Sequence, residues 1–282
     1  MYHQFPDFYY ALSHRLYNIL DGVGYSQNDR HRKVRNATEC EVFRNIRLNI
    51  SKSSLRMYIF GSRGEGSTGP GLYSDIDYLY HKNTIKVITD LYDGEAGKLY
   101  LYMLSDGHTH PGYVKLHPFT LSSDDNPVSL HDYSCTLDSS GLLVLSNTYL
   151  HLNDLGFRTG PAIRQQEKNI SCDRVLAFRG LQWPREGYEW FHRRRCYGWP
   201  KTSQIQNAWK YGCFATPVGH LCSNEQHLEW RLSFSIAERD LLRSFEETVM
   251  KVYILLKMVK KTFIEPVLED AYSSYHCKVC ML

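Results

Sequence analysis

The stretch Met57–Tyr80, MYIFGSRGEGSTGPGLYSDIDYLY, decides the fold class of this chain. It opens with the apolar run Met57–Phe60, which predicts a buried strand. A glycine-rich turn begins at Gly61-Ser62. The segment Ser74–Tyr80 alternates polar and apolar residues and predicts a second strand that forms a hairpin with the first.

Two acidic residues, Asp75 and Asp77, lie on the second predicted strand. Side chains two residues apart point to the same face of a strand, so we expect both carboxylates to face the turn at Gly61-Ser62. Such a pair repels itself unless a cation lies between the two groups. Mg²⁺ binds carboxylate oxygens together with substrate phosphates, and the backbone N–H groups and hydroxyl of the turn suit phosphate oxygens. The arrangement predicts a nucleotidyltransferase site, although a hairpin with two solvated acids has the same pattern.

Other nucleotide-binding motifs do not explain this stretch. Gly64-x-Gly66-x-x-Gly69 has the spacing of a dinucleotide fingerprint, but that fingerprint must open a helix. The sequence Gly69-Pro70-Gly71 is a poor helix start. The sequence contains no P-loop motif that ends in Gly-Lys-Ser/Thr.

Composition is that of a soluble globular protein. The 282 residues are enough for one large or two modest domains, with 43% apolar and 22% charged residues. A net charge of +3 predicts no strong general affinity for nucleic acid. The apolar run Val252–Leu256 is too short to cross a membrane, so no transmembrane segment is expected. The first residues do not resemble a signal peptide, and eight scattered cysteines suit a reducing compartment, so we expect a cytoplasmic protein.

Residues 6–50 are expected to form helices that pack against the sheet, with a polar break at 22–29. The second helical stretch carries the basic cluster Arg30-His31-Arg32-Lys33. Such a cluster is either a solvated helix face or a contact with nucleic acid or membrane.

Further strands are predicted at 99–104, 113–116, 141–146 and 169–184, and the rest of 117–170 is expected to be irregular. Asp173 precedes the apolar run Val175–Phe178. An acid at the head of a buried strand needs a partner, which makes Asp173 a candidate third metal ligand. A capping or turn aspartate would give the same pattern.

The second half of the chain is expected to be mainly helical, with one long helix at 236–263, an interruption at Pro266 and a new helix capped by Ser273. Because the chain stops at Leu282 inside that last helix, we expect an incomplete C-terminal lobe. The predicted class is α+β, a mixed sheet with flanking helices followed by a helical lobe. The predicted domains are a core with N-terminal spine helices at 1–185 and the lobe at 186–282.

Two groups of cysteines and histidines invite a metal interpretation, and we expect no structural zinc at either. The first group has no paired Cys-x-x-Cys framework. Its members are His192, Cys196, Cys213, His220 and Cys222. The second, Cys277-x-x-Cys280, lies on a predicted helix where both side chains can pack on one face.

With these residues identified, the chain resembles the family of cyclic GMP–AMP synthases and Mab-type (male-abnormal) nucleotidyltransferases, from about Met57 to the end. Five motifs in the right order carry the resemblance. They are Gly61-Ser62, Ser74-Asp75-Ile76-Asp77, the strand at Asp173 with Trp183-Pro184, Glu229–Ser235 and Ser273–Lys278. The details of GSRGEGSTGPG and of the turn Pro217–His220 look most like invertebrate members.

The resemblance implies a role for each motif. Asp75, Asp77 and Asp173 would hold two Mg²⁺ or Mn²⁺ ions and form the catalytic set. The nucleotide-binding residues implied are Gly61 and Ser62 for the triphosphate, Arg231 for a base or phosphate, Tyr275 for stacking on a base, and Ser274. Lys257 or Lys260 would reach a phosphate. ATP and GTP would be the substrates, and a cyclic dinucleotide made in innate immunity would be the product.

This sequence also departs from the family pattern. The zinc-bearing insertion of the DNA-sensing synthase is absent, because Ala237–Glu247 runs directly on from Ser-Phe-Ser. Relatives without the insertion include sensors of double-stranded RNA, which suggests that RNA or another ligand activates the protein at a basic surface. They also include developmental proteins, so a catalytically inactive protein that binds a nucleotide or a partner is the main alternative. A module that only binds nucleic acid is disfavoured by the modest net charge.

Overall fold

The computed structural model describes residues 6–72, 74–95, 98–105, 109–120, 134–149, 157–159, 162–167, 170–195, 198–268 and 272–282. The described chain is a mixture of helices and strands, which confirms the predicted α+β class. It divides into two compact units. One comprises residues 1–40, 61–75 and 238–282, and the other comprises residues 41–60 and 76–237. The domain boundary predicted near residue 185 stays a prediction.

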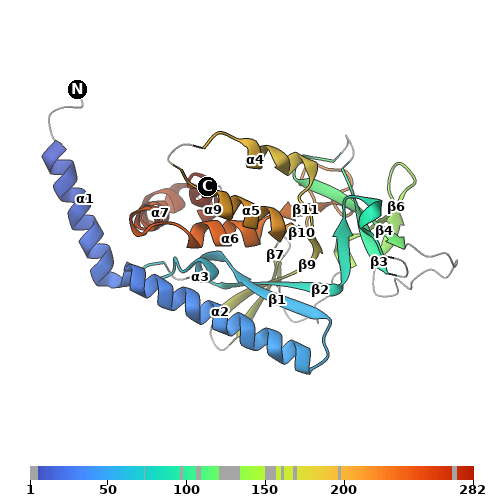
Figure 1. Ribbon diagram of the computed structural model, residues 1–282, viewed down its shortest axis with the longest axis horizontal. Helices are drawn as coiled ribbons and strands as arrows, with labels where there is room; N and C mark the ends of the chain where they lie inside the picture. The colour runs from blue at the N-terminus through green and yellow to red at the C-terminus, as the bar shows by residue number, and fades with distance from the viewer. Residues whose placement is uncertain are drawn as a thin grey trace. The chain divides into compact units, whose positions relative to one another are not determined.

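A mixed sheet of nine strands forms the larger unit, in the order β1-β2-β3-β4-β11-β10-β9-β8-β7 (Figure 1). The strands are β1 (Leu55–Phe60), β2 (Ile76–Ile88), β3 (Leu99–Leu104), β4 (Tyr113–Thr120), β7 (Phe157–Thr159), β8 (Ala162–Glu167), β9 (Ile170–Gly180), β10 (Cys213–Thr216) and β11 (Trp230–Ser233). A small separate sheet pairs β5 (Cys135–Leu137) with β6 (Leu143–Leu145). Strand β2 also pairs with β9 in parallel, so β2, β3, β4, β11, β10 and β9 form a closed path of paired strands.

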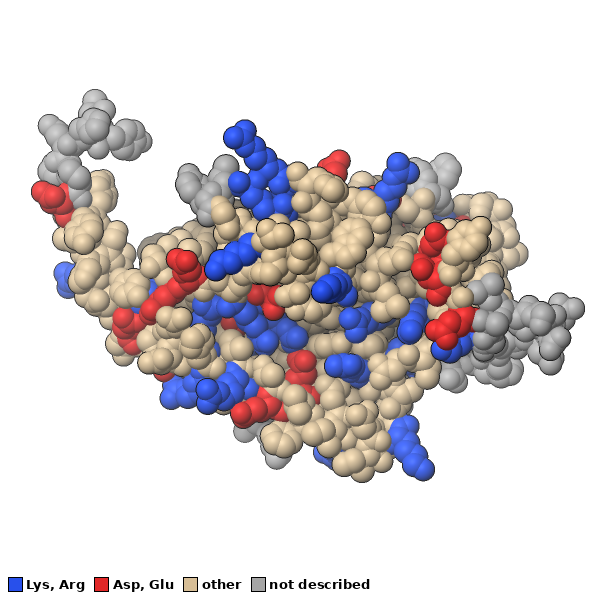
Figure 2. Space-filling view, in the orientation of Figure 1, with Lys and Arg blue, Asp and Glu red and all other residues tan. Residues whose placement is uncertain are grey.

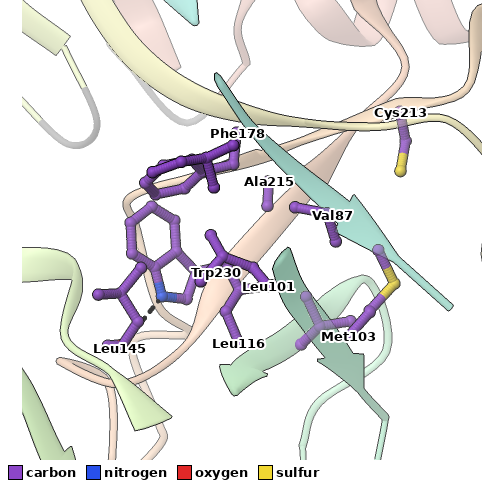
Figure 3. Packing of buried hydrophobic residues seen from close by; sticks show 11 residues of the cluster. Val87, Leu101, Met103, Leu116, Leu145, Phe178, Cys213, Ala215 and Trp230 are labelled. Atoms are coloured by element: carbon purple, nitrogen blue, oxygen red, sulfur yellow. Dashed lines mark hydrogen bonds between the residues drawn. The ribbon is translucent and has the colours of Figure 1, made fainter. Parts of the chain in front are cut away.

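The main apolar core of this unit lies between the strands of that closed path. Its members are almost fully buried and come from six strands of the large sheet and from β6. They include Val87, Leu101, Leu116, Leu145, Phe178, Ala215 and Trp230 (Figure 3). The indole N–H of Trp230 donates a hydrogen bond to the carbonyl of Leu145 at 3.0 Å, so the largest buried side chain also satisfies its polar atom. Complete burial of these side chains fixes the register of the strands.

The predicted hairpin is confirmed, with two differences. Strands β1 and β2 pair antiparallel, with Phe60 opposite Asp77. Strand β2 begins at Ile76, so Asp75 lies just before the strand. The turn contains a short helix, α3 (Gly61–Glu65), because its backbone closes helical hydrogen bonds before the glycine-rich loop starts.

The open edge of β1 is covered by the last turns of α2 (Gln27–Ile50). The amide of Asn45 donates to the Met57 carbonyl and accepts from the Met57 N–H, each at 2.8 Å. The carboxylate of Glu41 accepts from the Ile59 N–H at 2.9 Å. These side chains pair the backbone groups that an edge strand leaves exposed, so the predicted packing of helix against sheet is confirmed for the last turns of α2.

Two expectations about regularity were wrong. Residues 117–170 contain the end of β4 and strands β5, β7 and β8 in addition to the expected β6. The part expected as a helical lobe supplies β10 and β11 to the large sheet and three helices beside them, η4 (Arg185–Gly187), α4 (Tyr188–His192) and α5 (Thr202–Tyr211). Pairing with distant strands stabilises these segments, and local sequence patterns do not report such pairing.

The smaller unit is built from helices. They are α1 (Pro6–Leu20), η1 (Asp21–Tyr25), the first turns of α2, α3, most of α6 (Ser235–Arg243), α7 (Glu247–Val259), η5 (Lys260–Ile264), α8 (Glu265–Leu268) and α9 (Ser274–Val279). Segment η1 is joined to α7 through Lys251 of α7, whose ammonium contacts the carboxylate of Asp21 in η1 at 2.5 Å and that of Glu247 in its own helix at 2.9 Å. From its junction with η1, helix α1 extends away from the other helices of its unit (Figure 1).

The long helix predicted at 236–263 is two helices, and the basic cluster explains the break. The Arg30 guanidinium is buried and donates to the carbonyls of Leu242, Arg243 and Phe245. These carbonyls lie at the end of α6, where a helix leaves acceptors unpaired and carries a partial negative charge. Arg30 therefore has a structural role, which corrects both expectations for the cluster at this residue.

The prediction that Pro266 interrupts the helix was wrong. Pro266 lies in the first turn of α8, and η5 and α8 continue the helical path beyond α7. Proline is tolerated in a first turn because the N–H that it lacks would be unpaired there. The position of the serine cap is confirmed, because Ser273 is the N-cap residue of α9. Its backbone N–H donates to Nδ1 of His276 at 3.0 Å. None of the described helices is long and apolar enough to span a membrane.

The buried side chain of His81 is expected to make the unfolding free energy depend on pH. Its ring is buried on β2 and stacks on Tyr58, and neither ring nitrogen has a hydrogen-bond partner among the described residues. Burial, with Arg179 nearby, lowers the pKa of His81 from 6.5 to about 4. The unfolded chain therefore binds more protons below pH 6.5, and we expect the unfolding free energy to fall by up to roughly 3 kcal/mol as the pH drops from 6.5 to 4.

Urea unfolding of the wild type and of His81→Phe across this pH range measures the effect. Phenylalanine retains the aromatic contact and cannot titrate, so the variant should lose less stability in acid. An equal loss in both proteins would show that other groups cause the acid sensitivity.

Candidate active site

The centre of the candidate site is a pair of carboxylates on neighbouring strands of the larger unit. Asp77 on β2 and Asp173 on β9 are direct Cα partners in a parallel ladder. Direct partners on adjacent strands project from the same face of a sheet, so the two side chains share one face. The register therefore brings together two acids that are distant in sequence. Asp75 comes two residues before Asp77 in the chain.

A third side chain extends this row to the next strand. Arg164 on β8 is the Cα partner of Asp173 on the opposite side from Asp77. Its Nε lies 3.2 Å from Oδ1 of Asp173. The Arg164 side chain is 52% exposed and that of Asp173 is 21% exposed, so the pair is accessible to solvent. Arg164 supplies positive charge at the place where a cation is expected.

The predicted phosphate-binding turn lies in the smaller unit and starts directly after Phe60, the residue opposite Asp77. Within that unit, the buried ammonium of Lys257 on α7 donates to the hydroxyl of Ser62 at 2.7 Å and to that of Ser67 at 3.1 Å. Two hydroxyls and an ammonium form the polar surroundings of the turn. Lys260 instead pairs with Glu265 at 2.8 Å, so Lys257 is the lysine that contacts Ser62.

The glycine-rich loop after this turn is fixed by polar contacts to its carbonyls. Lys33 donates to the Thr68 carbonyl at 2.7 Å, and the Tyr25 hydroxyl donates to that of Pro70 at 2.9 Å. Gly69 packs closely on the Tyr25 ring: a Cβ atom added at position 69 would lie 2.5 Å from the nearest ring carbon. Lys33, like Arg30, is thus engaged by the protein itself, whereas Arg32 forms an exposed pair with Asp29.

The last residue of α3, Glu65, is buried and anchors the turn to the C-terminal helices of the same unit. Its carboxylate lies 2.6 Å from the ammonium of Lys278 on α9 and 3.4 Å from the hydroxyl of Tyr253 on α7. Burial lowers the pKa of Lys278, but Glu65 and Glu238 raise it, and the net pKa lies above its ordinary value. The Lys278 ammonium therefore stays protonated at neutral pH.

The other predicted nucleotide-binding residues are placed as follows. Arg231 is exposed on β11, where it is the Cα partner of Thr216 and of Tyr113. Ser274 begins α9, and the Tyr275 side chain next to it is 54% exposed. The start of α9 therefore carries the two predicted nucleotide-binding residues, and Lys278 near its end forms the observed ion pair with Glu65. Roles in nucleotide binding for these residues stay predictions.

The residues present fit a divalent cation in their chemistry. Asp77 and Asp173 offer carboxylate oxygens on one face, which are the ligands that Mg²⁺ and Mn²⁺ prefer. Among the described residues, no three His, Cys, Asp or Glu side chains are grouped so that they could hold a metal ion. Cys196, one of the cysteines considered for zinc, lies outside the described residues.

Three residues with the contacts described above were missed by sequence reasoning. Arg164 lies in a segment expected to be irregular, although Ala162–Glu167 followed closely by the strand at Ile170 could have indicated a hairpin. Glu65 and Lys278 lie inside quoted motifs, but nothing in the sequence pairs them.

The mixed sheet with flanking helices is consistent with a nucleotidyltransferase-type fold. Residues 148–244 match the family model described as the Mab-21 protein nucleotidyltransferase domain. The match confirms the resemblance over these residues, and it is a match to a nucleotidyltransferase domain. It includes Asp173 and Arg231 but not Asp75, Asp77 or the Gly61-Ser62 turn.

Proposed function

We propose that this protein is a metal-dependent nucleotidyltransferase that joins ATP and GTP into a cyclic dinucleotide on sensing a ligand, in the cytoplasm and in the service of innate immunity. The observation that carries the proposal is the direct pairing of Asp77 with Asp173 on parallel strands. Two carboxylates on one face have a high mutual repulsion that a divalent cation would relieve.

In this proposal Asp77 and Asp173, with Asp75 as the predicted third ligand, would hold Mg²⁺ or Mn²⁺, which would activate a ribose hydroxyl and stabilise the charge of the leaving pyrophosphate. The chain's own groups bind and orient the substrates. The ammonium of Lys257 and the hydroxyl of Ser62, whose Nζ and Oγ atoms are 2.7 Å apart, would contact the triphosphate at the Gly61 turn. Arg231, Ser274 and Tyr275 would contact a base or a phosphate, since exposed aromatic rings stack on bases.

A second candidate is a catalytically inactive protein that binds a nucleotide or a protein partner. The contact between Arg164 and Asp173 favours it, because one proposed metal ligand is already paired with a cation. Arg164 is an exposed side chain, however, and exposed ion pairs contribute only about 0–1 kcal/mol. A pair this weak does not prevent a metal from binding, so the enzyme remains the first proposal.

An activating ligand such as double-stranded RNA would require a basic surface. Arg30 and Lys33 do not provide one, because both donate to the protein's own carbonyls. Arg193 and Arg194, which follow α4, are exposed and are the better candidates. Lysine and arginine are interspersed with acidic and uncharged side chains over the face drawn in Figure 2. Any such ligand would therefore be bound through local contacts, and its binding would weaken as salt is added.

The function is tested by incubating the purified protein with labelled ATP and GTP, Mg²⁺ or Mn²⁺, and a panel of double-stranded RNA, DNA and other ligands. We expect a labelled cyclic dinucleotide with at least one activator and none from the paired variant Asp75→Asn with Asp77→Asn. Absence of product under every condition, with ATP binding retained, would favour the inactive nucleotide-binding protein.

Substitution of Lys257 tests the triphosphate contact separately from catalysis. Charge-assisted hydrogen bonds contribute about 1.5–3 kcal/mol, so Lys257→Met should weaken ATP binding by roughly 10- to 100-fold in calorimetric titrations. Lys260→Met is the matched control, because Lys260 pairs with Glu265 and should affect ATP binding little. Unchanged binding by Lys257→Met would remove this lysine from the proposed site.

A further inference from the structure

Arg164 contacts one of the proposed metal ligands, although the proposed reaction assigns it no role. It lies on β8 directly beside Asp173, which in turn lies directly beside Asp77. Side chains of direct partners project from one face, so the row across the three strands reads acid, acid, base. The guanidinium is therefore placed next to the carboxylates that the proposed function assigns to a divalent cation.

The chemistry of this contact is that of an exchangeable counter-ion. Arginine stays protonated at all ordinary pH values, so Arg164 is a permanent positive charge. Its Nε lies 3.2 Å from Oδ1 of Asp173, and its side chain is 52% exposed. An exposed pair is weak and costs little to separate. A divalent cation that binds Asp173 would be repelled by the guanidinium unless the arginine moves away.

We propose that Arg164 competes with the divalent cation for Asp173 and so sets the metal concentration at which the site fills. The proposal rests on the metal site of the proposed function. The guanidinium neutralises Asp173 when no metal is bound, which reduces the repulsion between Asp173 and Asp77. Filling of the site then requires the exchange of one cation for another, and the affinity for the metal is lowered by that exchange.

The test is direct measurement of Mn²⁺ binding by electron paramagnetic resonance of free Mn²⁺, without nucleotide. We expect Arg164→Gln to bind Mn²⁺ about threefold to tenfold more tightly than the wild type, because a unit positive charge near a divalent ion is removed. Arg164→Lys retains the charge and should resemble the wild type. Arg185→Gln removes an exposed arginine of the same unit that follows the end of β9, whereas Asp173 lies near the start of that strand, so it should change nothing.

Added salt provides a second readout. Because salt screens exposed charges, the difference between Arg164→Gln and the wild type should shrink as ionic strength rises. Unchanged or weaker Mn²⁺ binding by Arg164→Gln would overturn the proposal. Two further variants, Asp77→Asn and Asp173→Asn, separate it from the proposed function. If both bind Mn²⁺ as the wild type does, the metal site itself is wrong, whereas loss of binding in both with no effect of Arg164→Gln would refute only the competition.

Discussion

Replacing Asp173 with asparagine is expected to reduce the proposed nucleotidyl transfer at least about a thousandfold. Asparagine has the same shape as aspartate but lacks the negative charge that binds a divalent cation. A metal ion at such a site supplies several kcal/mol of transition-state stabilisation, and about 4 kcal/mol corresponds to roughly a thousandfold in rate. The strand pairing of Asp173 with Asp77 involves backbone groups only, so the substitution should leave the fold intact.

The measurement is the initial rate of product formation at saturating ATP, GTP and Mn²⁺, with thermal unfolding as a check on folding. Asp90→Asn is the matched control, because Asp90 is an exposed cap that accepts from the Tyr92 N–H, and asparagine caps equally well. A rate for Asp173→Asn within tenfold of the wild type would exclude Asp173 as a metal ligand.

The largest effect on stability is expected at the buried ion pair between Glu65 and Lys278. Lys278→Met leaves the Glu65 carboxylate buried with the Tyr253 hydroxyl as its remaining contact among those described above. Breaking a buried pair on one side costs about 3–5 kcal/mol, because an uncompensated charge remains inside the protein. Urea unfolding at pH 7 measures this loss.

The double variant Glu65→Gln with Lys278→Met provides the control. It removes both charges, so it should be more stable than Lys278→Met alone, and the two substitutions should be clearly non-additive. A double variant as unstable as the sum of the single variants would show that the two residues stabilise the protein independently. Since Glu65 ends the helix that carries Ser62, the single variants should also weaken ATP binding.

The sequence was informative where structure is local. The apolar run Met57–Phe60, the alternation around Asp77 and the serine cap of α9 each report on a few neighbouring residues, and these predictions were confirmed. Asp173 could be placed on a strand for the same reason. The Mab-type resemblance, which combined motifs in order, was confirmed over residues 148–244.

The features that could not be predicted depend on residues far apart in the chain. The break between α6 and α7 is explained by Arg30, more than two hundred residues earlier, which binds the carbonyls at the end of α6. Strand β8 is polar and has little strand character of its own, so only its pairing with β9 defines it. The contact between Arg164 and Asp173 follows from that pairing, and for this reason the sequence did not reveal it.

The most direct test of the account is a crystal structure of the protein soaked with Mn²⁺ and a non-hydrolysable ATP analogue, with anomalous scattering recorded for manganese. Oxygen ligands bind Mn²⁺ at roughly 2.0–2.3 Å, and we predict an anomalous peak at that distance from the carboxylates of Asp77 and Asp173, with Arg164 turned away from Asp173. A structure in which the analogue binds but manganese lies elsewhere, with Arg164 still on Asp173, would contradict the account.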